Sequence, residues 1–132
     1  MSALLSSDET HGILHISFQG PIGDEDAIKL YTRIAAWFAT HGYRSNITDF
    51  TGVTSFTVSA RTVTALAAKV PLVPNGFQRI MVAPQDTVFG SARMYEMLGS
   101  GTRDNVQVVR TLGEACKLLQ VESLDLKPID KW

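Results

Sequence analysis

The residues best suited to chemistry in this chain are the short polar side chains of residues 49–61, DFTGVTSFTVSAR. Asp49 follows a run of apolar residues, and Ser59 stands directly before a predicted helix. A serine in that place has two uses. Its hydroxyl can cap the helix by accepting a backbone N–H bond, or it can carry a phosphoryl group. The sequence leaves both uses open.

Similar polar residues follow the other predicted strands. Asp86 and Arg110 come just after residues 77–83 and 106–109, which have strand patterns. Because ligands and partners of α/β proteins bind at the carboxyl ends of parallel strands, we expect these side chains to share one surface. The expected partner surface consists of Asp49, Thr54, Thr57, Ser59, Arg61, Asp86 and Arg110.

A second candidate site lies in residues 88–98, VFGSARMYEML. Small residues are consecutive at Gly90, Ser91 and Ala92 in a predicted helix. Glycine costs a helix about 1 kcal/mol relative to alanine, so we expect a strand or a bound apolar ligand to approach closely there. In the ligand interpretation, methionine side chains adapt to the pocket and an arginine meets an anionic head group. The candidate pocket residues are Phe89, Arg93, Met94, Tyr95 and Met97.

No catalytic group or metal site is predicted. His11 and His15 have the even spacing of one strand face, but no cysteine or carboxylate joins them at ligand spacing. No Ser-His-Asp or Cys-His order and no glycine-rich phosphate loop is legible. We therefore expect no cofactor and a protein that is not an enzyme.

Composition limits the partners further. The 132 residues carry a formal net charge of −1 without a basic block, so we expect no nucleic acid partner. A single cysteine, Cys116, cannot form an intramolecular disulfide, which suits a reducing compartment. No apolar run approaches the roughly 20 residues of a membrane span, and the first residues lack a secretory pattern. We expect a cytoplasmic protein.

Strand and helix patterns alternate along the chain. Strands are predicted at residues 12–18, 46–50, 77–83 and 106–109, with helices opened by Asp24, Ser59, Asp86 and Thr111. Right-handed crossovers then give an α/β domain with a four- to five-stranded, mostly parallel sheet. We expect one domain over residues 1–132, with a core at about 11–120 and a tail at 121–132. A monomer or weak homodimer is expected, with Trp37 and the tail as candidate contacts.

Several segments together resemble one family. The stretch DFTGVTSFTVSARTVTAL is similar to the signature of the STAS family, the domain of sulfate transporters and anti-sigma-factor antagonists. GILHISFQGPI, RIMVAPQDTVFGSARMYEML and VQVVRTLGEACKLL resemble other parts of that family in the same order, over residues 12–119. The form AP-x-D-x-x-FG-x-AR-M-Y is closer to the bacterial SpoIIAA-like, or STAS/Sec14-like, stand-alone group. The resemblance implies a SpoIIAA-like fold and a non-enzymatic regulatory or protein-interaction module.

The antagonist branch of that family has Asp-Ser-Ser-Gly at the head of this helix, and its last serine is phosphorylated to release a kinase-like partner. The matching positions here are Thr57, Val58, Ser59 and Ala60. The resemblance makes Ser59 the phosphoacceptor candidate, although the other three motif residues differ. A carrier or sensor of a small apolar ligand or lipid is the alternative function, and an uncharacterised enzyme is a second alternative.

Overall fold

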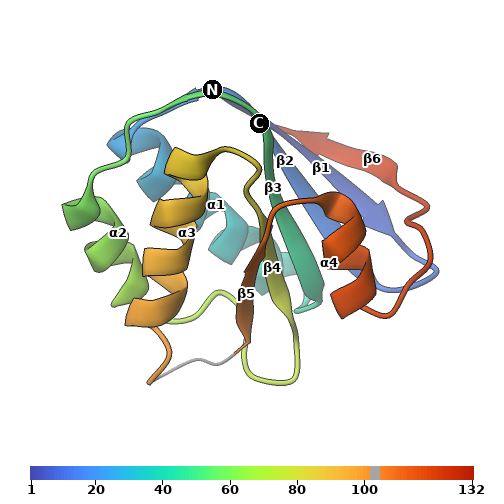
Figure 1. Cartoon of the computed structure of the whole chain (residues 1–132). Helices are drawn as coiled ribbons and strands as arrows, with labels where there is room; N and C mark the ends of the chain where they lie inside the picture. Colours follow the sequence, from blue (N-terminus) through green and yellow to red (C-terminus); the bar gives the residue numbers. More distant parts are fainter. Residues whose placement is uncertain (102–104) are drawn as a thin grey trace.

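The computed structural model describes residues 1–101 and 105–132, in which strands and helices alternate over most of the chain (Figure 1). The strands are β1 (Ser2–Asp8), β2 (Ile13–Ile22), β3 (Ser45–Phe56), β4 (Arg79–Val82), β5 (Val106–Val109) and β6 (Lys127–Lys131). The helices are α1 (Asp24–His41), α2 (Ala60–Ala67), α3 (Asp86–Leu98) and α4 (Leu112–Leu118).

The strands form a mixed sheet in the order β5-β4-β3-β2-β1-β6. The four strands from β2 to β5 are parallel to one another, whereas β1 pairs antiparallel with both β2 and β6. The expected α/β architecture is confirmed, but the predicted count of four to five strands is too low. The sequence interpretation omitted β1, and it treated β6 as part of a tail.

The strand β3 is also longer than the predicted residues 46–50. Its pairing with β2 continues to Ile22 and Phe56 across two irregularities in register. Threonine, valine and phenylalanine favour extended pairing, so the segment expected as a loop is strand. Asp49 therefore lies inside the sheet, paired with Ser17 on one side and Val82 on the other, and not at the end of a strand.

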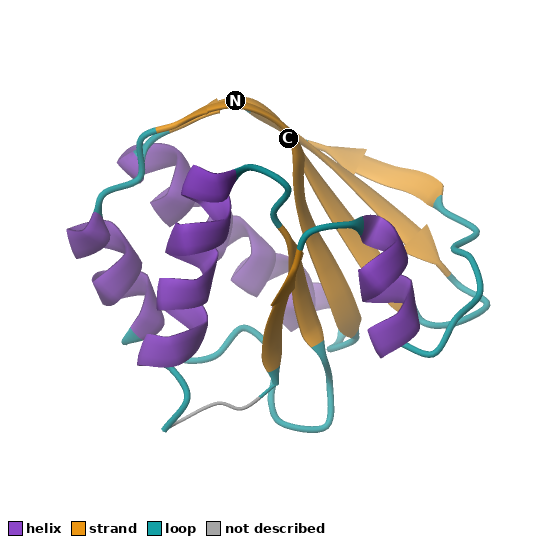
Figure 2. Ribbon diagram, viewed as in Figure 1, coloured by secondary structure: helices purple, strands orange, loops and turns teal. Residues whose placement is uncertain are grey.

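Helices cover both faces of the sheet, as Figure 2 shows. Helices α1, α2 and α3 lie on the face that receives Leu14, Ile16 and Phe18, the apolar side predicted for β2. Helix α4 lies on the other face, where Ala115 packs in a smaller cluster with Ile13, Ile47, Ile80 and Val82. Alternate residues of the central strands β2, β3 and β4 thus serve two separate cores.

Two helix starts differ by one residue from the predictions. Gly23 and Gln85 are the N-caps of α1 and α3, so Asp24 and Asp86 are first-turn residues and not caps. Ser59 and Thr111 do cap α2 and α4, because their hydroxyls accept backbone N–H bonds from Thr62 and Glu114. A carboxylate in a first turn is stabilised by the helix dipole and stays available for other donors.

No helix in the described parts of the chain combines the length and the apolar character needed to cross a bilayer.

Candidate functional site

The main candidate site is a cavity of about 90 Å³ between the sheet and helices α1, α2 and α3. Its lining is mostly apolar and comes from three helices and three strands. Prominent apolar members are Leu30, Ile34, Phe50, Val63, Met81 and Val88. Because it is larger than the roughly 15 Å³ that one water needs, the cavity has room for a small molecule.

The periodicities of helices and strands place these side chains. On α1, Ala27, Leu30, Tyr31 and Ile34 recur at helical spacing, so one face of the helix lines the cavity. On the sheet, Thr48 and Phe50 of β3 alternate with residues that point toward α4, and Arg79 and Met81 of β4 do the same. The part of the sheet that lines the cavity therefore carries two polar side chains, Thr48 and Arg79, among apolar ones.

The guanidinium of Arg79 is the unusual group of this cavity. Its residue is only 8% exposed, and within residues 1–101 and 105–132 no carboxylate forms an ion pair with it. Its Nη1 donates to the Tyr95 hydroxyl at 2.9 Å, and its Cζ lies 5.3 Å from the centre of the Tyr95 ring. Its buried Nε–H has no hydrogen-bond partner in the part of the chain that the structure describes. A buried cation without a counter-charge is costly, so this donor calls for an acceptor.

Thr48 and Asn46, neighbours of Arg79 on the same sheet face, carry further unpartnered atoms. Thr48 is 1% exposed, and its hydroxyl, which lines the cavity, has no partner. Asn46 pairs directly with Arg79 across β3 and β4, and its side-chain carbonyl is likewise buried and unpartnered. Buried polar groups are almost always hydrogen-bonded, so this local group of polar atoms without a partner is unusual.

The cavity approaches the surface between α1 and α2. Its partly exposed lining residues include Tyr31 on α1, Phe56 and Val58 before α2, and Leu66 on α2. Two polar contacts join α1 to the ends of α2: Asp24 contacts Ser59, the N-cap, and the Tyr31 hydroxyl donates to the carbonyl of Val70, which follows the helix. A ligand entering here would pass between these two contacts.

The lining is equipped for binding more than for proton transfer. Arg79, Tyr31 and Tyr95 are its titratable members, and an arginine stays protonated throughout the physiological range. A carboxylate or imidazole, the usual general acid or base, is not part of the lining. Three or more potential metal ligands are nowhere clustered among the described residues.

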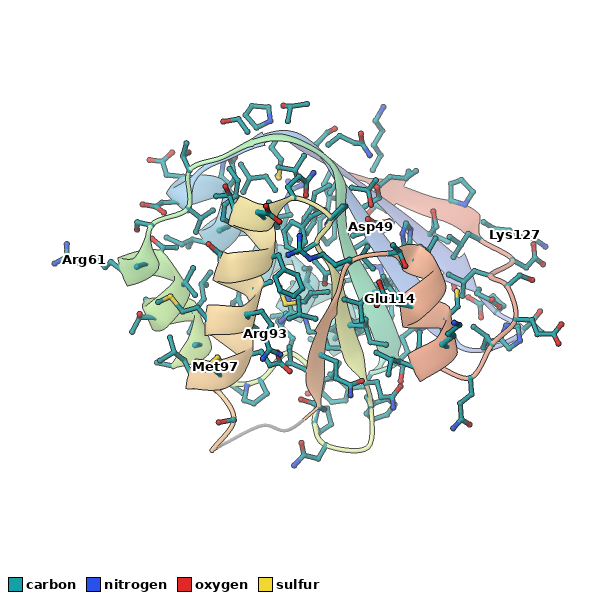
Figure 3. All side chains as sticks on the ribbon, in the orientation of Figure 1. Asp49, Arg61, Arg93, Met97, Glu114 and Lys127 are labelled. Atoms are coloured by element: carbon teal, nitrogen blue, oxygen red, sulfur yellow. The ribbon has the colours of Figure 1, made fainter. Side chains whose placement is uncertain are left out.

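Ser59 lies where the predicted partner surface begins. Its backbone N–H donates to Asp24 Oδ1 at 2.7 Å, and its hydroxyl donates to Asp24 Oδ2 at 3.1 Å. The backbone N–H of Ser59 holds the pKa of Asp24 below its ordinary value. Ser59 thus caps α2 and also ties the first turn of α1 to it. Thr54, Thr57 and Arg61 nearby are exposed, and Arg61 projects away from α2 in Figure 3.

Asp86 and Arg110 meet at the carboxyl ends of β4 and β5. Their exposed ion pair measures 2.7 Å, and Arg110 also donates to the Pro84 carbonyl. The guanidinium of Arg110 lies 3.8 Å from the centre of the Phe89 ring. The loops before α3 and α4 thus lie at the same end of the sheet, as the parallel order predicts (Figure 1).

Asp49 faces a different environment from the rest of that predicted surface. It shares the α4 side of the sheet with Ile47, as its position in Figure 3 also shows. Its Oδ2 lies 2.9 Å from His15 Nε2. Burial raises the pKa of Asp49, but hydrogen bonds from His15 and from the Thr51 hydroxyl and N–H outweigh it, and the pKa is lowered. His11, by contrast, lies in the turn before β2 and contacts Asp8, so the two histidines do not share a site.

Of the predicted pocket residues on α3, Tyr95 lines the cavity. The cavity-facing residues of this helix are Val88, Ser91, Ala92 and Tyr95. Arg93 and Met97 are exposed, and Arg93 pairs with Glu96. Phe89 lies under Arg110, and Met94 packs against the main core. The expected close approach at Gly90 is wrong, because nothing lies within 4 Å of where a Cβ would stand.

Sequence reasoning missed Arg79 and Thr48, the polar groups of the cavity. The signal was present in QRIMVA, where an arginine occupies the same strand face as Met81 and Ala83. An arginine on an inward strand position is rare, because charged residues are almost never fully buried unless paired.

No family model matches this chain, and no curated protein matches it in sequence.

Proposed function

We propose that this protein is a binding module for a small amphipathic molecule, held in the cavity between the sheet and helices α1, α2 and α3. The observation that carries the proposal is the combination of an apolar cavity with a buried arginine on its wall, whose Nε–H has no hydrogen-bond partner among the described residues. Ligand sites are typically apolar clefts with a few convergent polar groups. The module acts as a carrier or sensor without catalysing a reaction.

The size of the cavity limits the ligand. At about 90 Å³ it is a little over half of the roughly 150 Å³ cavity that accommodates a benzene ring. The enclosed part of the ligand is therefore a short chain, and any longer part leaves through the opening between α1 and α2. A cytoplasmic location belongs to this proposal, since the single Cys116 suits a reducing compartment.

Native mass spectrometry of freshly purified full-length protein tests the proposal. We expect a retained small-molecule adduct on the wild type, and its loss in Ala27→Leu, because the larger side chain fills the cavity from α1. Ala36→Leu is the matched control, since Ala36 is an exposed position of the same helix. An adduct that persists equally in both variants would place the ligand elsewhere. Empty wild-type protein, together with no binding of any added small amphiphile, would contradict the function.

A second candidate function is a regulatory protein-interaction module of STAS type, similar to an anti-sigma-factor antagonist, with its partner at the head of α2. The observation that favours it is the Asp24–Ser59 contact, because a phosphate on Ser59 would stand against the Asp24 carboxylate. The partner surface is then Thr54, Thr57, Ser59 and Arg61, with Asp86 and Arg110 further along the same end.

Affinity capture from the native host with wild-type and Ser59→Asp protein tests this candidate. We expect Ser59→Asp to remain folded and to change the amount of a specific captured protein, while Arg93→Met, altered at an exposed position outside this surface, behaves as wild type. Equal capture by wild type and Ser59→Asp would remove the head of α2 as the recognition surface.

A further inference from the structure

The polar atoms of the cavity that lack a hydrogen-bond partner indicate which polar group the ligand has. The Nε–H of Arg79 and the hydroxyl of Thr48 are both buried and have no hydrogen-bond partner among residues 1–101 and 105–132, and both residues line the cavity. One is a charged donor and the other can donate. Both lie on the same face of the paired strands β4 and β3. A ligand atom that satisfies both is an acceptor.

The hydrogen bonds that Arg79 already makes limit which acceptor groups the ligand can present to it. Nη1 of Arg79 already donates to the Tyr95 hydroxyl, whereas Nε–H is unused. The Nε side of an arginine presents two parallel N–H groups, which match the two oxygens of a carboxylate. Tyr95 fixes the plane of the guanidinium, so the recognition edge is held in place before the ligand arrives.

Charge separates a carboxylate from a phosphate. Arg79 contributes one positive charge to the cavity, and among the residues that the structure describes no other lysine, arginine or histidine is part of the lining. One carboxylate neutralises that charge, while a phosphate monoester carries about −1.5 to −2 and would leave excess negative charge in an apolar site. The charge of Arg79 therefore favours a ligand with a single negative charge over a phosphate monoester.

We infer that the ligand is a short aliphatic carboxylate, whose head group accepts hydrogen bonds from Arg79 Nε and the Thr48 hydroxyl while its chain lies among Leu30, Phe50 and Met81. The inference rests on the proposed function and adds the chemical class of the ligand. Binding is reversible and involves no covalent step. The bound carboxylate satisfies two buried donors of the cavity by accepting their hydrogen bonds.

NMR titration of the full-length protein with hexanoate, hexanol and hexylamine tests the inference, since the three share a chain and differ in the head group. We expect wild type to bind hexanoate at least about tenfold more tightly than hexanol, because a hydrogen bond to a charged group exceeds a neutral one. Arg79→Met should abolish that preference and leave hexanol binding within about threefold of wild type. Arg93→Met, which removes an exposed arginine of α3, should keep the preference.

Thr48→Val supplies a second variant of nearly unchanged shape, in case Arg79→Met does not fold. It should weaken hexanoate by about threefold or more and leave hexanol unchanged. Equal affinity for hexanoate and hexanol, or tighter binding of hexylamine, would overturn the carboxylate inference and leave the binding function standing. Binding of none of the three would overturn both.

Discussion

Thr48 has a buried hydroxyl that bears on the stability of the fold. It has no hydrogen-bond partner among the described residues, which carries a penalty of about 1–3 kcal/mol. Thr48→Val should therefore raise the free energy of unfolding of the ligand-free protein by about 1 kcal/mol, measured by urea denaturation. Thr54→Val, at an exposed position of the same strand, should change it by less than about 0.5 kcal/mol. A loss of stability in Thr48→Val would mean that the hydroxyl has a partner in solution.

Asp8 is the residue that links the two ends of the chain. Its carboxylate accepts bonds from the backbone N–H of His11 at 2.9 Å and from that of Asp125 at 3.1 Å. Burial opposes the charged form, but these bonds and the His11 side chain lower the pKa of Asp8 to about 2. The carboxylate thus binds fewer protons in the folded than in the unfolded chain at mildly acid pH.

Protonation of Asp8 at low pH should lower the stability of the folded protein. Asp8 contributes its stabilisation fully above its unfolded pKa of about 4, and the contribution is lost as the pH falls toward the folded value. Asp8→Asn should lower the free energy of unfolding at neutral pH by about 1–3 kcal/mol. It should also flatten the decline between about pH 4 and pH 2. Parallel pH profiles for wild type and variant, measured by denaturant unfolding, would contradict this role.

Residue types predicted some local roles and not others. The caps at Ser59 and Thr111 were predictable, because a hydroxyl before an apolar helical pattern is a common helix start. The burial of Arg79 was not, because its environment depends on which face of β4 turns toward α3. That choice is set by packing across the whole sheet.

At the scale of elements, the sequence predicted β4, β5 and the four helices but ended β2 and β3 too early, at residues 18 and 50. The central strands are apolar and bounded by turn residues, so their patterns are strong. β1 was missed because both of its faces are largely buried and its residues do not alternate simply. β6 was missed because all five of its residues are exposed and its pairing uses only the backbone.

The sequence also did not predict which face of α3 lines the cavity. Two stripes on this helix carry bulky residues, and the pocket predicted from the sequence combined Phe89, Arg93 and Met97 of one stripe with Met94 and Tyr95. The other stripe, Val88, Ala92 and Tyr95, is the buried one. The smaller side chains of that stripe leave the space that the cavity occupies.

The strand β6 should stabilise the edge of the sheet. Trp132 exchanges two backbone hydrogen bonds with Ala3, and β6 covers the outer side of β1. Removal of residues 126–132 should lower the melting temperature by at least about 5 °C and expose an unpaired edge that promotes self-association.

Calorimetry and light scattering at two concentrations measure both effects of this removal. Lys127→Ala, which keeps the backbone pairing of an exposed position, is the control and should behave as wild type. A truncated protein that melts as wild type and stays monomeric would show that β6 contributes little to the sheet.

At the scale of the whole molecule, the two faces of the sheet have different contents. One face holds the apolar cavity with Arg79, and the other holds α4 and the buried His15–Asp49 contact. With a net charge of −1, the chain has little long-range field to attract an anion. Capture of a carboxylate would therefore depend on the single buried cation and should show a weak dependence on salt.

Methyl NMR of the full-length protein during titration with hexanoate tests most directly whether the cavity binds a small amphipathic molecule. Binding there predicts shifts of the methyl signals of Ile34, Val63 and Val88, while those of Ile13, Ile47 and Ile80 on the α4 side remain in place. Unchanged spectra at millimolar hexanoate, or shifts centred on the α4 side, would contradict it.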